Sequence, residues 1–108
     1  MSATKHDSNK ARLGLLPWTS LTEIAKVLSF GADKYEKYNW RKGFSYERVL
    51  SATLRHVASF SEGEDNDPET GLSHLAHAGC NVLFLLHFVI TGTGTDDRPN
   101  TKGVIDGK

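Results

Sequence analysis

Two histidines and an asparagine share one side of the most apolar stretch of the chain. His74, His77 and Asn81 stand at positions i, i+3 and i+7, which place them on one face of a helix. A buried polar group without a partner costs about 1–3 kcal/mol, so a metal ion, a substrate or a neighbouring polar helix face should satisfy them. Ordinary core histidines, bonded to backbone or water, are the alternative. Because an acidic loop adjoins this face, we favour a functional site.

The acidic loop, residues 63–71, supplies carboxylates close to these histidines. Carboxylates alone suit Mg²⁺, and added imidazoles favour Mn²⁺ or another transition metal. We therefore predict a site for a divalent metal, whose ligands are Glu64, Asp67, His74 and His77. Whether Glu62 replaces Glu64 as a ligand stays open, because the end of the preceding helix is uncertain by a few residues.

The helix expected before this loop carries a second polar face. Arg55, Ser59 and Glu62 stand at i, i+4 and i+7, and His56 is next to Arg55. An arginine can hold a phosphate through two hydrogen bonds, and a carboxylate or an imidazole can take a proton from water. The predicted catalytic base is Glu62 or Glu69, with His56 as an alternative. An ordinary solvated helix face is the competing interpretation.

A cluster of cations and aromatic rings in residues 34–42 is typical of a nucleotide site. Cations suit phosphates, and an aromatic ring suits a stacked base. A mononucleotide fits better than a nucleic acid, because the segment is short and the formal net charge of the chain is zero. The alternative is a surface turn with its rings tucked into the core. The predicted nucleotide-binding residues are Lys34, Tyr35, Asn39, Trp40, Arg41, Arg55 and Asn81.

The zero net charge conceals two oppositely charged stretches. Residues 1–55 have a net charge of +5, whereas residues 56–71 contain five acids and no Lys or Arg. Two ordinary charged surfaces would give the same totals. We interpret the basic stretch as the binding region for phosphates and the acidic stretch as the binding region for their metal cation.

The spacing of apolar residues predicts a helical chain. Ser20 and Glu23 form a capping box, and apolar residues then recur at helical spacing up to Gly31. We expect a first helix over this range. A short helix and a turn that ends at Gly43 should follow.

Two longer helices are expected in the rest of the chain. The first runs from the N-cap Ser45 to about Glu62, with Leu50, Leu54 and Val57 as its apolar stripe. The sequence Asp-Pro-Glu at residues 67–69 is typical of a helix start. A last helix should therefore begin there or just after and run to about Thr91.

The last helix determines the expected architecture. Residues 82–86 are apolar on all sides, which indicates a central core helix or a subunit interface. Three histidines and an asparagine interrupt it, and it is too short for a membrane span. The predicted fold class is all-α, a small bundle of three to four helices in residues 1–92, with a flexible tail at residues 93–108. So small a bundle buries a limited core, so we expect a homo-oligomer, a dimer or tetramer.

The cysteine content and the N-terminus bear on the compartment. The single Cys80 excludes an internal disulfide and fits a reducing compartment. The N-terminus lacks the layout of a signal peptide. We expect a cytoplasmic protein, in the host cytoplasm if it is phage-encoded, with no membrane and no nucleic-acid partner.

The motifs together resemble a known family. They are residues 30–35 (FGADKY), residues 39–43 (NWRKG), the Arg55-His56 pair and the spaced set from Gly63 to Asn81. Over roughly residues 5–90 the chain resembles the N-terminal domain family of phage dATP/dGTP diphosphohydrolases. The layout is also similar to the all-α, MazG-like pyrophosphohydrolases, which bind Mg²⁺ through Glu-x-x-Glu and Glu-x-x-Asp pairs. In this sequence His77 and Asn81 stand where such an acidic pair would face the metal.

The resemblance implies hydrolysis of a purine deoxynucleoside triphosphate, dATP or dGTP, to monophosphate and pyrophosphate. A bound divalent metal would polarise the triphosphate and lower the pKa of the attacking water. A non-catalytic phage protein that sequesters nucleotides is the second hypothesis. The third is a structural or adaptor bundle in which the polar face is only an interface. Tight binding without turnover would favour the second, and absence of nucleotide binding the third.

Overall fold

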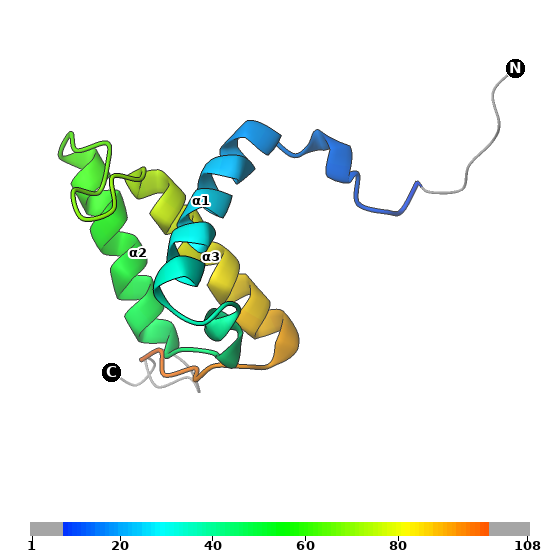
Figure 1. Ribbon diagram of the computed structural model, residues 1–108. Helices are drawn as coiled ribbons and strands as arrows, with labels where there is room; N and C mark the ends of the chain where they lie inside the picture. The colour runs from blue at the N-terminus through cyan, green and yellow to red at the C-terminus, as the bar shows by residue number, and fades with distance from the viewer. Residues whose placement is uncertain (1–7, 100–108) are drawn as a thin grey trace, which may run out of the picture.

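The computed structural model describes residues 8–99, which form three α-helices and two 3-10 helices (Figure 1). The order is η1 (Leu13–Leu15), α1 (Trp18–Lys34), η2 (Asn39–Lys42), α2 (Tyr46–Ser61) and α3 (His74–Thr91). No strand occurs among these residues, although two isolated bridges link loop positions. The predicted all-α class is therefore confirmed.

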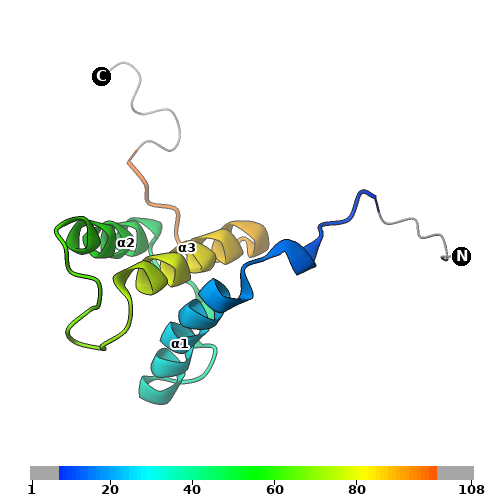
Figure 2. The same cartoon turned by 90° about the horizontal axis from the view of Figure 1, so that it is seen from above.

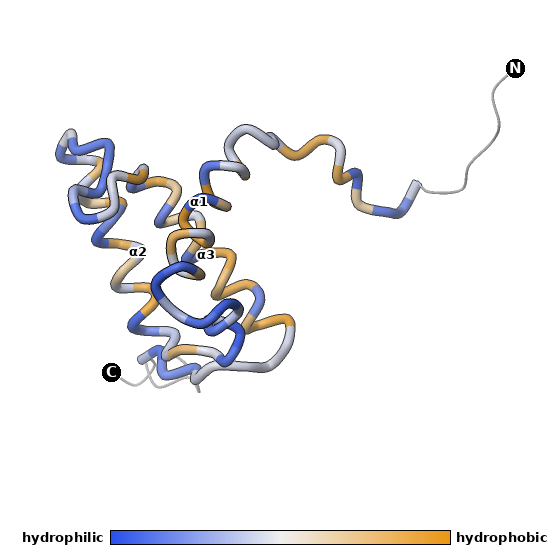
Figure 3. Tube along the Cα trace, viewed as in Figure 1, coloured by the Kyte–Doolittle hydropathy of each residue, from blue (hydrophilic) through white to orange (hydrophobic). Residues whose placement is uncertain are grey.

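Helix α3 is the central element. Helices α2 and α3 run antiparallel side by side, and α1 crosses α3 at a steep angle (Figure 2). The short helix η2 packs against α3 as well. Hydrophobic residues follow α3, whereas residues 33–42 and the loop after α2 are hydrophilic (Figure 3). The segment predicted to bind phosphate thus packs on α3 through η2, and the loop predicted to bind the metal leads into α3.

Helix α1 is longer at both ends than the sequence predicts. It begins at Trp18, directly after Pro17, whose carbonyl accepts from the N–H of Leu21 at 3.0 Å. Proline favours the start of a helix because its φ is already set, so Ser20 lies inside the helix and the predicted capping box is wrong. The helix also passes through Gly31 and ends at Lys34, so the predicted helix end at Gly31 is wrong too.

Helix α2 has the predicted ends. The Ser45 side chain accepts from the N–H of Arg48 at 3.3 Å, which confirms it as the N-cap. Glu62 is the C-cap, and Gly63 follows with a φ of 100°. This positive φ favours glycine and turns the chain into the acidic loop.

Helix α3 begins later than expected and ends where expected. Its N-cap is Ser73, whose side chain accepts from the N–H groups of Leu75 and Ala76. The Asp67 side chain does not cap a helix; it accepts from the N–H and hydroxyl of Thr70 and closes a turn within the loop. The predicted start at residues 67–69 is therefore wrong. The end at Thr91 is confirmed, with Gly92 as a left-handed cap.

The core is small and uses a different face of α2 from the one predicted. Tyr46, Val49 and Phe88 form its buried centre, and Trp40, Phe84 and Leu85 pack around them. The predicted apolar stripe of α2 is not part of it, because Leu50, Leu54 and Val57 are 36%, 65% and 41% exposed. Helix α2 instead turns Val49 and Thr53 inward.

The segment after α3 is bound to the start of α2. The N–H of Tyr46 donates to the carbonyl of Thr95 at 2.9 Å, and the N–H of Thr95 donates to the carbonyl of Phe44 at 3.1 Å. The Asp97 carboxylate accepts from the Ser45 hydroxyl at 2.5 Å and from the N–H of Glu47 at 3.0 Å. The prediction of a tail from residue 93 is therefore wrong for residues 93–97. Residues 100–108 lie outside the described part of the chain.

The expectation that the last helix is too short for a membrane span is wrong, because α3 could cross a membrane by length and composition alone. The same test is passed by the core helix of a folded domain, so a single such helix is weak support for a membrane span. Here His74, Ala76, Ala78, Cys80 and Phe88 are buried within the domain. We therefore treat α3 as the core helix of the bundle.

Candidate functional site

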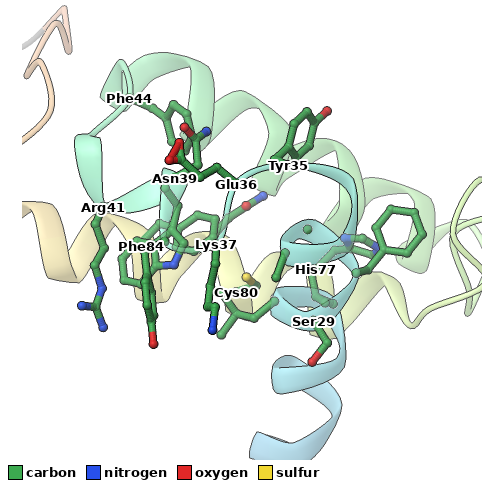
Figure 4. Close-up of a pocket in the computed structure, with 18 of the residues that line it drawn as sticks. Ser29, Tyr35, Glu36, Lys37, Asn39, Arg41, Phe44, His77, Cys80 and Phe84 are labelled. Carbon is green, nitrogen blue, oxygen red and sulfur yellow. The ribbon is translucent and has the colours of Figure 1, made fainter.

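A cavity of about 510 Å³ lies between the end of α1, the following segment and α3 (Figure 4). Cavities of this size accept small organic ligands. Cys80, between His77 and Phe84, marks the α3 wall in Figure 4. Most of the lining is apolar, and its polar members come from three segments. They are Ser29, Tyr35, Glu36, Lys37, Tyr38, Asn39, Arg41, Thr70, His77 and Asn81.

The cavity brings together most of the predicted nucleotide-binding residues. Those that line it are Tyr35, Asn39, Trp40, Arg41 and Asn81, from two segments about forty residues apart. Lys34 and Arg55 are not part of the lining. Lys34 instead lies over the ring of Tyr35, with Nζ 5.4 Å from the ring centre.

Of the two aromatic rings predicted to stack on a base, one already has a stacking partner. The Trp40 ring stacks on Phe84, with centroids 4.8 Å apart, and meets the His87 ring edge-on. Trp40 therefore belongs to the core, as the alternative interpretation expected. Tyr35 remains 59% exposed at the cavity, so its ring can still stack on a ligand.

The backbone of Tyr38, which lines the cavity, has an unusual conformation. Tyr38 is in the left-handed region, with a φ of 65°, and it is the only described non-glycine residue with a positive φ. The Arg41 guanidinium lies 4.5 Å from the Tyr38 ring centre and 5.4 Å from that of Trp40. These cation–π contacts hold the guanidinium at the edge of the cavity.

A chain of three side chains connects α2, the acidic loop and α3. His74 is only 3% exposed, and both of its ring nitrogens have partners. Its Nε2 is 2.7 Å from Oε1 of Glu64, and its Nδ1 is 2.9 Å from Nδ1 of His56. The polar face of α3 is thus satisfied in part by a polar residue of the neighbouring helix.

A second chain runs from the loop to His77. Nε2 of His77 is 2.8 Å from Oγ1 of Thr70 and 3.7 Å from Oδ2 of Asp67. The Thr70 hydroxyl donates to the same Asp67 oxygen at 2.9 Å. Both Thr70 and His77 line the cavity, so this chain of side chains forms part of the cavity wall.

The two chains meet where His56 and His77 stack. Their ring centres are 4.5 Å apart and the planes differ by 5°. Burial lowers the pKa of His56, and the nearby His77 and His74 lower it further. Burial also lowers the pKa of His77, a shift that Asp67 partly opposes. Both imidazoles are therefore neutral at pH 7, the form that accepts a proton.

The carboxylate of Asp67 is held in its charged form. Burial alone would raise its pKa, but hydrogen bonds from the side chain and backbone of Thr70 and the proximity of His77 together lower it. A charged Asp67 acts only as a hydrogen-bond acceptor.

The four predicted metal ligands fall into two pairs. Glu64 is hydrogen-bonded to His74 at 2.7 Å, whereas Asp67 lies 3.7 Å from His77 and is linked to it through the Thr70 hydroxyl. Within residues 8–99, no group of three or more His, Cys, Asp or Glu side chains is arranged to hold a metal ion. A metal site made entirely of protein ligands therefore does not fit this arrangement. Mg²⁺, in contrast, usually binds through one or two carboxylates together with substrate phosphates.

The predicted catalytic bases differ in their surroundings. His56 lies in the histidine cluster, whereas Glu62 and Glu69 are exposed. Cys80 faces the cavity, but burial raises the pKa of its thiol to about 11. The thiol is therefore protonated at neutral pH and a poor nucleophile.

Sequence reasoning missed two members of the site, Thr70 and Lys37. An Asp followed three residues later by Thr is a common turn signal, and this signal could have identified Thr70. Lys37 belongs to the same basic segment as Arg41 and could have been included on the same grounds.

The fold and the site together define a small all-α domain with a cavity beside two stacked imidazoles. The family described as dATP/dGTP diphosphohydrolase, N-terminal, matches residues 2–98, and the chain belongs to this family. A dATP/dGTP diphosphohydrolase of Salmonella phage PMBT28 is 39% identical over 98 residues. The match covers 91% of this chain and 33% of that protein, so the chain spans about a third of its relative. No solved structure matches the chain.

Proposed function

We propose that this domain binds a purine deoxynucleoside triphosphate, dATP or dGTP, and takes part in its hydrolysis to monophosphate and pyrophosphate. The observation that carries the proposal is the cavity, which joins Tyr35, Asn39 and Arg41 to His77. The family and the name of the phage relative support the same substrate class.

The apolar part of the cavity would take the base and sugar. Tyr35 would stack on the base, and Asn39 or Asn81 would read its edge. Lys37 and Arg41 would neutralise phosphate charge, since positioning and electrostatics dominate such reactions. Arg55 and Lys34, outside the cavity lining, would act on the phosphates at longer range.

In the hydrolysis, a water oxygen would bond to the α-phosphorus while the bond from that phosphorus to the bridging oxygen breaks. The electron pair of the broken bond leaves with pyrophosphate. One proton of the water passes to an imidazole of the His56–His77 pair and from there to solvent. Both imidazoles are suited to this step because they are neutral at pH 7.

A divalent cation, Mg²⁺ or Mn²⁺, would enter as part of the substrate, bound to the triphosphate. Oε1 of Glu64 is engaged by His74, and its other oxygen has no protein partner among residues 8–99. That oxygen would be available to the cation or its water shell, with Asp67 nearby. A metal carried by the substrate would supply charge neutralisation without a closed protein site.

Incubation of the pure protein with dATP or dGTP, with and without Mg²⁺ or Mn²⁺, tests the proposal through pyrophosphate release. We expect release that requires the metal and falls in a Tyr35→Ala or Arg41→Ala variant. Glu47→Gln, at the far end of α2, is the matched control. No release with any metal would overturn catalysis, and tight nucleotide binding without release would favour the sequestering alternative.

We also propose that two or more copies of the chain associate. Leu50, Leu54 and Val57 on α2 and a second apolar stripe on α3 are exposed. At 3.6 residues per turn, the α3 stripe projects opposite to His77 and Phe84, away from the cavity. It consists of Leu75, Val82, Leu86 and Val89. Exposed apolar stripes of this kind are typical of an interface.

A further inference from the structure

Thr70 lies at the centre of the chain that ends at His77. Its Oγ1 is 2.9 Å from Oδ2 of Asp67, 2.8 Å from Nε2 of His77 and 3.2 Å from the N–H of Leu72. A hydroxyl has one hydrogen to donate and two lone pairs that accept. The three contacts therefore use the one hydrogen and both lone pairs of the hydroxyl. In each contact the hydroxyl is either the donor or the acceptor.

The directions follow from the partners. The Asp67 carboxylate is charged and can only accept, so it takes the hydroxyl hydrogen. The amide of Leu72 can only donate, so it uses one lone pair. The remaining lone pair must accept from Nε2 of His77, which therefore carries the hydrogen of that ring.

A neutral imidazole with its hydrogen on Nε2 has an unprotonated Nδ1. The stack on His56, with ring centres 4.5 Å apart, favours the neutral form because two charged rings at that distance would repel. His77 lines the cavity. The ring is thus held in a form whose Nδ1 can accept a proton.

We propose that Thr70 is a positioning residue which, with Asp67, holds His77 as the Nε2–H tautomer, so that Nδ1 accepts the proton of the attacking water. The role of Nδ1 rests on the proposed hydrolysis. The tautomer itself does not, because it follows from the hydrogen bonds alone.

Nitrogen-15 NMR of the histidine side chains in the full chain reads the tautomer directly, without a ligand. We expect His77 to be a single Nε2–H tautomer at neutral pH in the wild type and in Thr70→Ser, which keeps the hydroxyl. Thr70→Val has nearly the same shape but no hydroxyl, and a fraction of Nδ1–H tautomer should appear in it. An Nδ1–H tautomer in the wild type, or an unchanged Nε2–H spectrum in Thr70→Val, would overturn the proposal.

Kinetics with dATP and dGTP give the second readout. Thr70→Val should lower kcat by about 10-fold with little change in KM, whereas Thr70→Ser should stay close to the wild type. Equal kcat for Thr70→Val and the wild type would overturn the role of Nδ1. If the wild type hydrolyses nothing, the proposed function fails while the NMR result still decides the tautomer. If Thr70→Val does not fold, the spectra of the wild type and Thr70→Ser decide it.

Discussion

Nε2 of the buried His74 lies 2.7 Å from Oε1 of Glu64, and its Nδ1 lies 2.9 Å from Nδ1 of His56. Nε2 of His74 donates to Glu64, because a carboxylate only accepts, and a ring with that single hydrogen accepts through Nδ1. His56 then donates through Nδ1 and keeps an unprotonated Nε2. In this arrangement the α2–loop–α3 junction holds a second imidazole with an unprotonated nitrogen, in the opposite tautomer from His77.

The first prediction concerns the stability of this junction. His74→Ala should lower the free energy of unfolding by about 1–3 kcal/mol, because it removes a buried side chain and leaves partly buried partners unpaired. Glu64→Gln should cost less than about 1 kcal/mol, since the Glu64 side chain is 51% exposed. Glu62→Gln, on the exposed C-cap of α2, is the control. Urea unfolding followed by circular dichroism measures all three, and equal stability of His74→Ala and the control would contradict the network.

The second prediction is a loss of stability in mild acid. The pKa values of His56 and His77 are lowered in the folded state from their ordinary value of 6.5. The unfolded chain therefore binds more protons than the folded chain as the pH falls below about 6.5, and the free energy of unfolding falls with it. The stabilisation that the two lowered pKa values provide is complete above that pH. It is lost as the pH drops through the folded-state pKa values.

Urea unfolding at pH 7.5 and pH 5.5 tests this dependence. A His56→Gln/His77→Gln double variant should show a smaller difference between the two pH values than the wild type. His87→Gln, on the same helix as His77, controls for removing a histidine. An equally large loss of stability at pH 5.5 in the double variant would assign the effect to other groups.

The third prediction concerns the close approach of two loops. A Cβ at Gly43 would lie 2.4 Å from the backbone nitrogen of Gly94, and Gly43 has a φ of +95°. Gly43→Ala should therefore strain the backbone and force the 93–97 segment away from α2, at a cost above the roughly 1–3 kcal/mol of a strained φ alone. Gly63→Ala is a matched control, because its φ is +100° but a Cβ there meets nothing within 4 Å. Equal melting temperatures for the two variants would show that no steric contact exists.

The fourth prediction concerns the cap that Asp97 places on α2. Hydrogen bonds from Ser45 and the backbone of Glu47 lower the pKa of the Asp97 carboxyl. Asp97→Ala and Ser45→Ala should each lower the melting temperature, and the double variant should fall by less than the sum, because both remove the same bond. Strict additivity would indicate that the two side chains do not interact in solution.

Much of this architecture could be predicted from the sequence because the signals are local. The N-cap at Ser45 and the helix end at Thr91 depend on adjacent residues, and the alignment of His74 and His77 follows from helical spacing. The start of α1 differs from the prediction because Pro17 starts the helix ahead of the capping box expected at Ser20. The start of α3 was missed because Asp67 satisfies Thr70 in a turn and not a helix end.

The rest depends on contacts that no local pattern contains. The stack of His56 on His77 requires the relative rotation of α2 and α3, which the core at Val49 and Phe88 sets. The role of Trp40 required its partner Phe84, more than forty residues away. The same rotation decides that Leu50, Leu54 and Val57 point outward, whereas their spacing alone suggested a buried stripe.

The fifth prediction follows from that exposed stripe. Leu54→Glu and Val82→Glu should each shift the chain toward the monomer in analytical ultracentrifugation, because a charge in a buried apolar interface is costly without a partner. Leu13→Glu, in η1 outside the two stripes, is the control, since Leu13 is 64% exposed and Leu54 is 65% exposed. Circular dichroism should show that both variants keep their helices. A wild-type chain that sediments as a monomer at all concentrations would contradict the proposed association, and an equal shift in Leu13→Glu would place the interface elsewhere.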